Sequence, residues 1–225
     1  MSPFIAAITQ MPLIAILRGI RPDEAVGVAD ALVTAGFRLV EVPLNSPEPL
    51  RSVEILAKHL PDNCIVGAGT VLRVEDVSSV TAAGGQFVVA PNLNREVGDA
   101  AKKNGLTWCP GVLTPSEAFE AVDQDADLLK IFPAELVSPV GIAALRAVLP
   151  PRVLIAAVGG ITPQSMEDYV VAGANGFGLG SSLYKAGMSP GEVKERAIRF
   201  TSEFDKLRKS NRIRPGTKYC SKQYP

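Results

Sequence analysis

Eight short apolar runs recur along the chain, and segments with helical periodicity lie between them. The runs have the length and the β-branched content of buried strands, and they lie at 13–19, 39–44, 64–70, 87–92, 107–111, 128–133, 154–160 and 176–182. Strict alternation of strands and helices predicts a parallel sheet with right-handed crossovers, and eight units favour a single α/β (β/α)8 TIM barrel. An open doubly wound sheet more often has a GxGxxG turn after its first strand, whereas this chain has Gly19-Ile20-Arg21-Pro22.

Local signals mark where the helices begin and end. The starts are predicted where a hydroxyl can cap the helix and a proline fits its first turn, at Ser46-Pro47, Thr114-Pro115, Ser138-Pro139, Thr162-Pro163 and Ser189-Pro190. Capping boxes are predicted from Thr114 with Glu117 and from Ser189 with Glu192. The ends are predicted at the glycines Gly36, Gly84, Gly105 and Gly173.

The chain has no break in composition before residue 205. We therefore predict one barrel domain over residues 1–205 and a polar, basic tail over residues 206–225. The formal net charge is zero and the basic residues form no stripe, which indicates a small-molecule partner and neither nucleic acid nor an anionic membrane. The first residues lack a signal-peptide pattern and no apolar run reaches the ~18 residues of a membrane span, so we expect a cytoplasmic protein.

Neither cysteine nor histidine is arranged for metal binding. Cys64, Cys109 and Cys220 are odd in number and show no CxxC spacing, which argues against a disulfide framework and a thiolate metal site. His59 is the only histidine and lies on a predicted outer helix. We expect no metal and no other cofactor.

Three ionisable residues lie in or at the ends of predicted interior strands. Lys130 interrupts the apolar run DLLKIFPAE, Glu41 lies inside LVEVPL, and Arg18 ends the first strand. Barrel enzymes carry their chemistry at the C-terminal ends of the strands, where these residues would meet. Because isolated charges in a dry core are costly, they either compensate one another in a structural network or line a substrate pocket.

Glycine-rich turns follow the last two predicted strands, which favours the substrate pocket. The first is VGG at 158–160 and the second is GLGSS at 178–182. Glycines there expose backbone N–H groups, and the loops after strands 7 and 8 are where such barrels commonly hold phosphate. The sequence therefore predicts a phosphorylated substrate beside Lys130.

A lysine in such a pocket can act as a nucleophile if its pKa falls below the reference value of ~10.4. Burial and the nearby Arg18 lower this pKa, whereas an ionised Glu41 raises it. A free amine would attack a ketone to give a Schiff base, with Glu41 shuttling protons. The alternatives are a sugar-phosphate isomerase or epimerase, with Glu41 as the base and Lys130 protonated, and a binding protein without turnover.

Eight motifs carry a resemblance to a known family. LIAILRGI, EVPLNSP, GAGTVL, APN, CPG, LKIFPAE, AVGGITP and GLGSSLY, in this order over residues 13–184, resemble the class I aldolases of 2-keto-3-deoxy-6-phosphogluconate (KDPG) and its galactonate epimer (KDPGal). The resemblance implies that Lys130 forms a Schiff base with the C2 ketone and that Glu41 passes the protons. Cleavage of C3–C4 would then give pyruvate and glyceraldehyde 3-phosphate.

The resemblance also implies binding roles and an assembly. Arg18, Thr70 and the turn at Pro91 would hold the pyruvyl end, and phosphate would bind at Gly159, Gly160, Gly180 and Ser181. A homotrimer is expected from the family alone.

Two positions bear on which epimer is used. The gluconate aldolases that the chain resembles typically have an arginine four residues after the catalytic glutamate and a threonine before the Gly-Gly pair, where this chain has Asn45 and Val158. Losing a hydrogen-bonding hydroxyl can shift the preference between C4 epimers. The pattern therefore favours KDPGal, and the alternatives are KDPG and 4-hydroxy-2-oxoglutarate (KHG).

Overall fold

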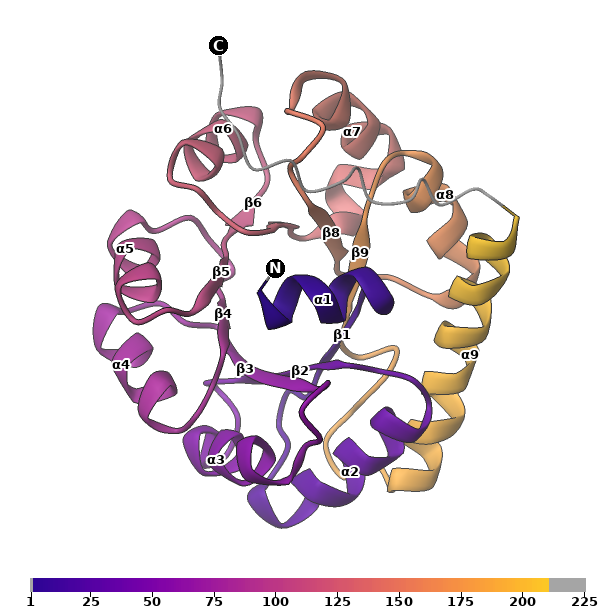
Figure 1. Cartoon of the computed structure of the whole chain (residues 1–225). Coiled ribbons are helices and arrows are strands. Elements are labelled where there is room, and N and C mark those ends of the chain that lie inside the picture. The colour runs from indigo at the N-terminus through magenta and orange to yellow at the C-terminus, as the bar shows by residue number, and fades with distance from the viewer. Residues whose placement is uncertain (1, 211–225) are drawn as a thin grey trace.

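The eight apolar runs form one parallel sheet that curls around a central axis, with helices outside it (Figure 1). The computed structural model describes residues 2–210. The strands are β1 (Leu13–Ile16), β2 (Leu39–Pro43), β3 (Ile65–Gly69), β4 (Phe87–Val89), β5 (Thr107–Cys109), β6 (Gly111–Val112), β7 (Leu129–Ile131), β8 (Ile155–Val158) and β9 (Gly176–Leu179). The helices are α1 (Pro3–Gln10), α2 (Pro22–Thr34), α3 (Pro49–His59), α4 (Val74–Ala82), α5 (Arg95–Lys103), α6 (Pro115–Asp123), α7 (Ala134–Val148), the 3-10 turn η1 (Pro163–Ser165), α8 (Met166–Val171) and α9 (Pro190–Lys209).

The predicted barrel is confirmed, with one of its eight strands divided in two. The strand order is β5-β4-β3-β2-β1-β9-β8-β7-β6, so β5 and β6 are the two ends of the sheet. Both ends come from the fifth apolar run, in which Pro110 separates them. Proline has no N–H to donate to a ladder. Its carbonyl still accepts a hydrogen bond of 2.9 Å from the Lys130 N–H, so the two ends meet at the strand that carries the lysine.

The strands separate two apolar layers. Side chains that face outward pack under the helices, whereas inward-facing side chains at alternate positions form a smaller interior cluster that includes Ile14 and Ile16 of β1, Leu39 of β2 and Leu128 before β7. This alternation continues toward the C-terminal ends of the strands. It places Arg18, Glu41 and Lys130 on the inner side.

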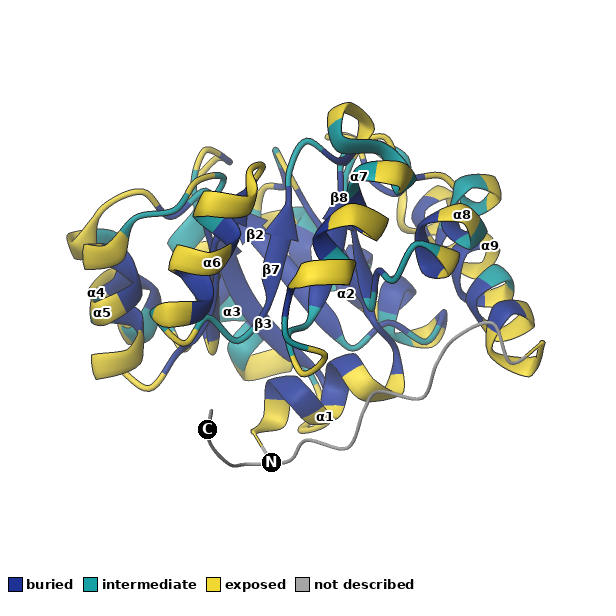
Figure 2. Ribbon diagram, turned by 90° about the horizontal axis from the view of Figure 1, so that it is seen from above, coloured by how far each residue is buried: buried dark blue, intermediate teal, exposed yellow. Residues whose placement is uncertain are grey.

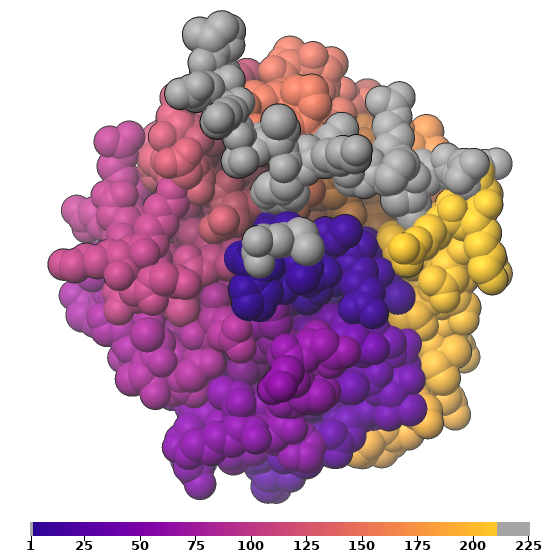
Figure 3. Space-filling model, in the orientation of Figure 1, coloured from indigo at the N-terminus to yellow at the C-terminus, as the bar shows by residue number. Residues whose placement is uncertain are grey.

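Helix α1 closes the opposite end of the barrel and was not predicted. It lies across the opening in Figures 1 and 3, and below the strand arrowheads in Figure 2. Phe4, Ile5, Ala7 and Ile8 are buried in the interior cluster, and the Phe4 ring lies 5.3 Å from that of Phe87. The barrel interior around Lys130 can therefore be reached only from the C-terminal ends of the strands.

Most predicted helix boundaries are confirmed. Both predicted capping boxes form, and positive φ angles occur at all four glycines predicted to end helices. One predicted start was wrong. Helix α3 begins at Pro49 and not at Pro47, because the Ser46 hydroxyl accepts a hydrogen bond of 2.9 Å from the Gly19 N–H and so joins two loops. The start predicted at Ser138-Pro139 is confirmed, because Ser138 has non-helical dihedral angles and a second helical segment follows it within α7.

Helix α9 continues past residue 205 to Lys209. The remainder of the predicted tail, including Cys220, lies almost wholly outside the described residues. No helix within residues 2–210 is long and apolar enough to cross a membrane.

Replacing Ser138 by glycine is expected to stabilise the fold. Ser138 has φ 60° and ψ 170°, a conformation that is essentially restricted to glycine and costs about 1–3 kcal/mol in other residues. The entropy cost of glycine offsets about 0.5–1 kcal/mol of that relief, so we expect the free energy of unfolding to rise by about 1 kcal/mol. Urea denaturation at matched protein concentration measures it. Ser138→Ala keeps the Cβ atom and should not raise the free energy of unfolding. Equal stability of Ser138→Gly and Ser138→Ala would contradict backbone strain at this position.

Candidate active site

Lys130 lies in the barrel interior, with its side chain only 5% exposed. It is in register with Gly111 of β6 on one side and with Ala156 of β8 on the other. Gly111 and Ala156 have little or no side chain, so they leave room around the lysine stem. The ammonium lies over the ring of Phe132, 4.7 Å from its centre. The Lys130 side chain is therefore surrounded by small residues and one aromatic ring.

Glu41 is the acidic partner in this interior and is 2% exposed. Its carboxylate lies over Gly69 of the neighbouring strand, where an added Cβ would collide with Oε1. Gly69 is thus required for Glu41 to take this position. No hydrogen bond or ion pair joins Glu41 to Lys130 within the described residues, although each affects the other's titration. The two side chains therefore affect each other through their charges and not through a direct contact.

The electrostatics of the pair are dominated by burial. Burial lowers the pKa of Lys130, the charge of Glu41 opposes this shift, and Arg18 adds to it. Burial also raises the pKa of Glu41, against the opposing charges of Lys130 and Arg18. Both shifts disfavour the charged forms. The arrangement therefore increases the free-amine fraction of Lys130 and makes the Glu41 carboxylate a stronger proton acceptor, which suits it to proton transfer.

Arg18 lies at the mouth of the interior and not in its core. It is exposed, and its Nη1 donates a hydrogen bond of 2.6 Å to Asn45 Oδ1. The predicted alternative of a buried structural network is therefore wrong, because Arg18 pairs with an amide at the rim. The link also joins the β1–α2 and β2–α3 loops, which the Gly19 to Ser46 hydrogen bond holds together.

Thr70 and Pro91 end β3 and β4 on the same face of the barrel. Thr70 has φ 58°, which is rare for a β-branched residue and indicates a conformation held by its surroundings. The Pro91 carbonyl group packs against Gly111, where an added Cβ would collide with it. Gly111 is in register with Lys130, so Pro91 lies beside the lysine strand.

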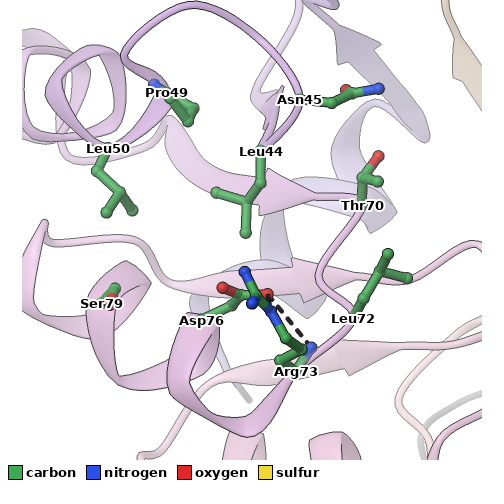
Figure 4. A pocket seen from close by; sticks show the side chains of 9 residues that line it. All are labelled: Leu44, Asn45, Pro49, Leu50, Thr70, Leu72, Arg73, Asp76 and Ser79. Atoms are coloured by element: carbon green, nitrogen blue, oxygen red, sulfur yellow. Dashed lines mark hydrogen bonds and ion pairs between the residues drawn. The ribbon is translucent and has the colours of Figure 1, made fainter.

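A groove of about 550 Å³ opens next to this mouth, between the β2–α3 and β3–α4 loops. Asn45 and Thr70 lie at one side of it, and Leu50 and Ser79 lie at the other (Figure 4). An ion pair between Arg73 and Asp76 lies along its edge, with 3.6 Å between Nε and Oδ2. Lys130 does not line this groove, which therefore adjoins the candidate active site without containing it.

The two glycine-rich turns offer backbone donors at the opposite side of the mouth. Gly159 and Gly160 have φ of 111° and 67°, which favours glycine at both positions. Within residues 2–210, no protein acceptor pairs with the amides of Gly159, Gly160, Gly180 or Ser181. An added Cβ at Gly180 would meet open space. These turns therefore present unpaired N–H groups toward solvent.

Val158 lies at the end of β8, immediately before the first of these turns. It is 7% exposed and belongs to the interior cluster. A Cβ added at Gly178 would lie 2.7 Å from Val158 Cγ2 and 3.2 Å from Ile16 Cδ1. Val158 is thus an apolar wall residue between the interior and the turn.

The sequence prediction missed three neighbours of the pair. Phe132 could have been found, because alternation along the strand places it on the same side as Lys130. Gly69 could not have been found, since its contact with Glu41 depends on the register of β2 and β3. Cys109 was considered as a disulfide partner or a metal ligand, and burial raises the pKa of its thiol well above the usual value.

Other chemistry-bearing residues lie apart from the site. Cys64 and Cys109 are free thiols, and Cys220 lies outside the described residues. His59 pairs with Asp30 on the surface, with 2.7 Å between Nε2 and Oδ1. Among residues 2–210, no group of three or more His, Cys, Asp or Glu side chains is arranged to hold a metal ion.

Comparisons with known proteins agree on one family. The family model described as KDPG and KHG aldolase matches residues 4–196. A probable 2-dehydro-3-deoxy-6-phosphogalactonate aldolase of Rhizobium meliloti is 48% identical over 87% of this chain and 92% of its own length. The 2-dehydro-3-deoxy-6-phosphogalactonate aldolase of Escherichia coli is 44% identical over 87% of this chain and 96% of its own. A solved structure described as native KDPGal superposes with a TM-score of 0.87 at 43% identity, covering 89% of this chain and 97% of that one.

Proposed function

Because the chain belongs to the KDPG and KHG aldolase family, we propose that it is a class I aldolase that reversibly cleaves 2-dehydro-3-deoxy-6-phosphogalactonate into pyruvate and glyceraldehyde 3-phosphate. The observation that carries this proposal is the buried Lys130 amine. Its pKa is lowered, and it shares the barrel interior with Glu41, which is the one buried carboxylate among residues 2–210. An amine of this kind is a nucleophile for ketones.

The proposed reaction begins with attack of the Lys130 amine on the C2 carbonyl of the substrate. Glu41 supplies a proton to the carbinolamine hydroxyl, water leaves, and a protonated Schiff base remains. Glu41, now ionised, removes the proton from the C4 hydroxyl. The electrons of the C3–C4 bond then pass into the iminium group, which gives an enamine and releases glyceraldehyde 3-phosphate. Protonation of the enamine at C3 and hydrolysis of the imine release pyruvate and restore the free amine.

The two ends of the substrate are assigned to different loops of the mouth. For the carboxylate and the pyruvyl carbons we propose Arg18, Thr70 and Pro91, which follow β1, β3 and β4. For the phosphate we propose Gly159, Gly160, Gly180 and Ser181, whose unpaired amides are suited to a phosphate group. The substrate would then span the mouth with C2 above Lys130.

Preference for the galactonate epimer is expected from Asn45 and Val158. Asn45 is engaged by Arg18, and Val158 presents methyl groups where a threonine would present a hydroxyl. Pyruvate release from the two phosphorylated epimers, measured in parallel with lactate dehydrogenase as the coupling enzyme, should show a higher kcat/KM for KDPGal. Val158→Thr and Asn45→Arg should each move the ratio toward KDPG by about tenfold.

The outcomes of this comparison separate two claims. Preference of the unmodified enzyme for KDPG would leave the Schiff-base mechanism in place and would refute the roles of Asn45 and Val158. Inactivity on both epimers, with no pyruvate adduct on Lys130, would refute the proposed function as a whole.

We further propose that the enzyme is a homotrimer of the cytoplasm. A cytoplasmic location fits a substrate with carboxylate and phosphate charges, which does not cross a bilayer unaided. An assembly is supported by two apolar side chains of α7, Leu136 and Val140, which are 74% and 79% exposed. Sedimentation equilibrium measures the mass of the assembly directly.

A further inference from the structure

An acidic side chain lies against the turn that we propose as part of the phosphate site. A Cβ atom added at Gly160 would lie 2.5 Å from Glu135 Oε2, and one added at Gly159 would lie 3.0 Å from the same atom. Glu135 is itself exposed, so its carboxylate is in contact with solvent. The reaction proposed above gives Glu135 no role.

The backbone that carries Glu135 is fixed to this turn. The Cβ position of Gly159 lies 3.3 Å from the Ala134 N and 3.5 Å from the Pro133 Cα. From the other side, the Tyr169 hydroxyl of α8 donates a hydrogen bond of 3.1 Å to the Ala134 carbonyl. Burial, and secondly the charge of Glu135, raise the pKa of Tyr169, which fits a negative potential at this place. The carboxylate is thus held near the turn.

The second turn of the same site carries the opposite charge nearby. Arg196 of α9 donates from Nη1 to the Ser181 carbonyl at 3.4 Å. A phosphate bound to the amides of both turns would therefore have a cation near one turn and an anion near the other. Phosphate monoesters carry a charge of about −1.5 to −2 at pH 7, so the carboxylate repels them.

We propose that Glu135 weakens phosphate binding at the Gly159–Gly160 turn and thereby speeds release of the phosphorylated product; this rests on the proposed function. Phosphate binding that is equally strong in substrate, transition state and product does not raise kcat. It slows departure of the product, which limits turnover in many enzymes. Glu135 is accordingly an affinity-setting residue and takes no part in the chemistry.

The test is Glu135→Gln, with inorganic phosphate as a competitive inhibitor of KDPGal cleavage. We expect the inhibition constant of phosphate and the KM of KDPGal to fall by about threefold to tenfold, and kcat to fall as well because the phosphorylated product leaves more slowly. The difference should shrink as ionic strength rises, because salt screens exposed charges. Glu135→Asp keeps the charge and should stay close to the unmodified enzyme. Glu75→Gln, an exposed carboxylate on α4, should change neither constant.

Two results would overturn the inference in different ways. If phosphate inhibits the unmodified enzyme and Glu135→Gln with equal constants, Glu135 does not set the affinity, and the phosphate site stands. If phosphate competes in neither protein while pyruvate still forms its adduct on Lys130, the phosphate site itself is wrong, and the inference fails with it.

Discussion

Lys130→Met is expected to lower kcat for cleavage of KDPGal by about 10⁴-fold or more. Methionine fills a similar volume beside Phe132 and Gly111 but has no amine, so neither a carbinolamine nor a Schiff base can form. The loss should be measured as pyruvate release under saturating substrate. Reduction with borohydride in the presence of pyruvate should add mass to Lys130 in the unmodified protein and should add none in the variant.

The pH dependence of the rate at which the pyruvate adduct forms tests whether the pKa of Lys130 is lowered. Only the free amine reacts, so the rate of adduct formation should rise with pH and level off at a pH below the usual pKa of lysine, since burial lowers the pKa of Lys130. Circular dichroism of Lys130→Met should match that of the unmodified protein. Full activity in Lys130→Met, or an adduct on another lysine, would refute the assignment and favour the isomerase alternative.

The barrel could be predicted because its signals are local. Each strand is a short apolar run, and proline, hydroxyl and glycine signals at helix ends act within a few residues. Helix α1 was missed because its role is tertiary: it closes the barrel by burying Phe4 and Ile5 against strands far along the chain. The division of β5 from β6 at Pro110 likewise depends on closure of the sheet, where Pro110 lies between its two ends.

Lys130 and Glu41 could be predicted as the reacting pair because burying an ionisable side chain costs free energy. Two such residues in apolar strands therefore indicate a functional site. The positions of the residues around this pair could not be predicted, because they depend on contacts between loops. Ser46 was read as a helix cap and instead joins two loops, which places Arg18 beside Asn45. The contact between Glu41 and Gly69 could not be predicted either, because it depends on the register of β2 and β3, which lie far apart in sequence.

Glu41→Gln is expected to lower kcat by about 10²-fold to 10⁴-fold, the usual contribution of a general acid and base. Glutamine has the same shape as glutamate, so its side chain can occupy the same position over Gly69, but it cannot accept a proton. Burial raises the pKa of Glu41, so in the unmodified enzyme kcat should fall as acid protonates this carboxylate before cleavage. This decrease of kcat at acidic pH should be absent in the variant. Steady-state measurement of kcat over a range of pH values tests it.

The nucleophile should survive this change, which separates the two roles. Because the charge of Glu41 raises the pKa of Lys130, its removal leaves the amine at least as free at neutral pH. Borohydride should therefore still trap pyruvate on Lys130 in Glu41→Gln, more slowly but to the same final extent, while cleavage is nearly lost. Glu48→Gln, at an exposed carboxylate of the loop that follows β2, should behave as the unmodified enzyme. Unchanged cleavage in Glu41→Gln would exclude Glu41 as the proton shuttle, since a glutamine in its place has no proton to exchange.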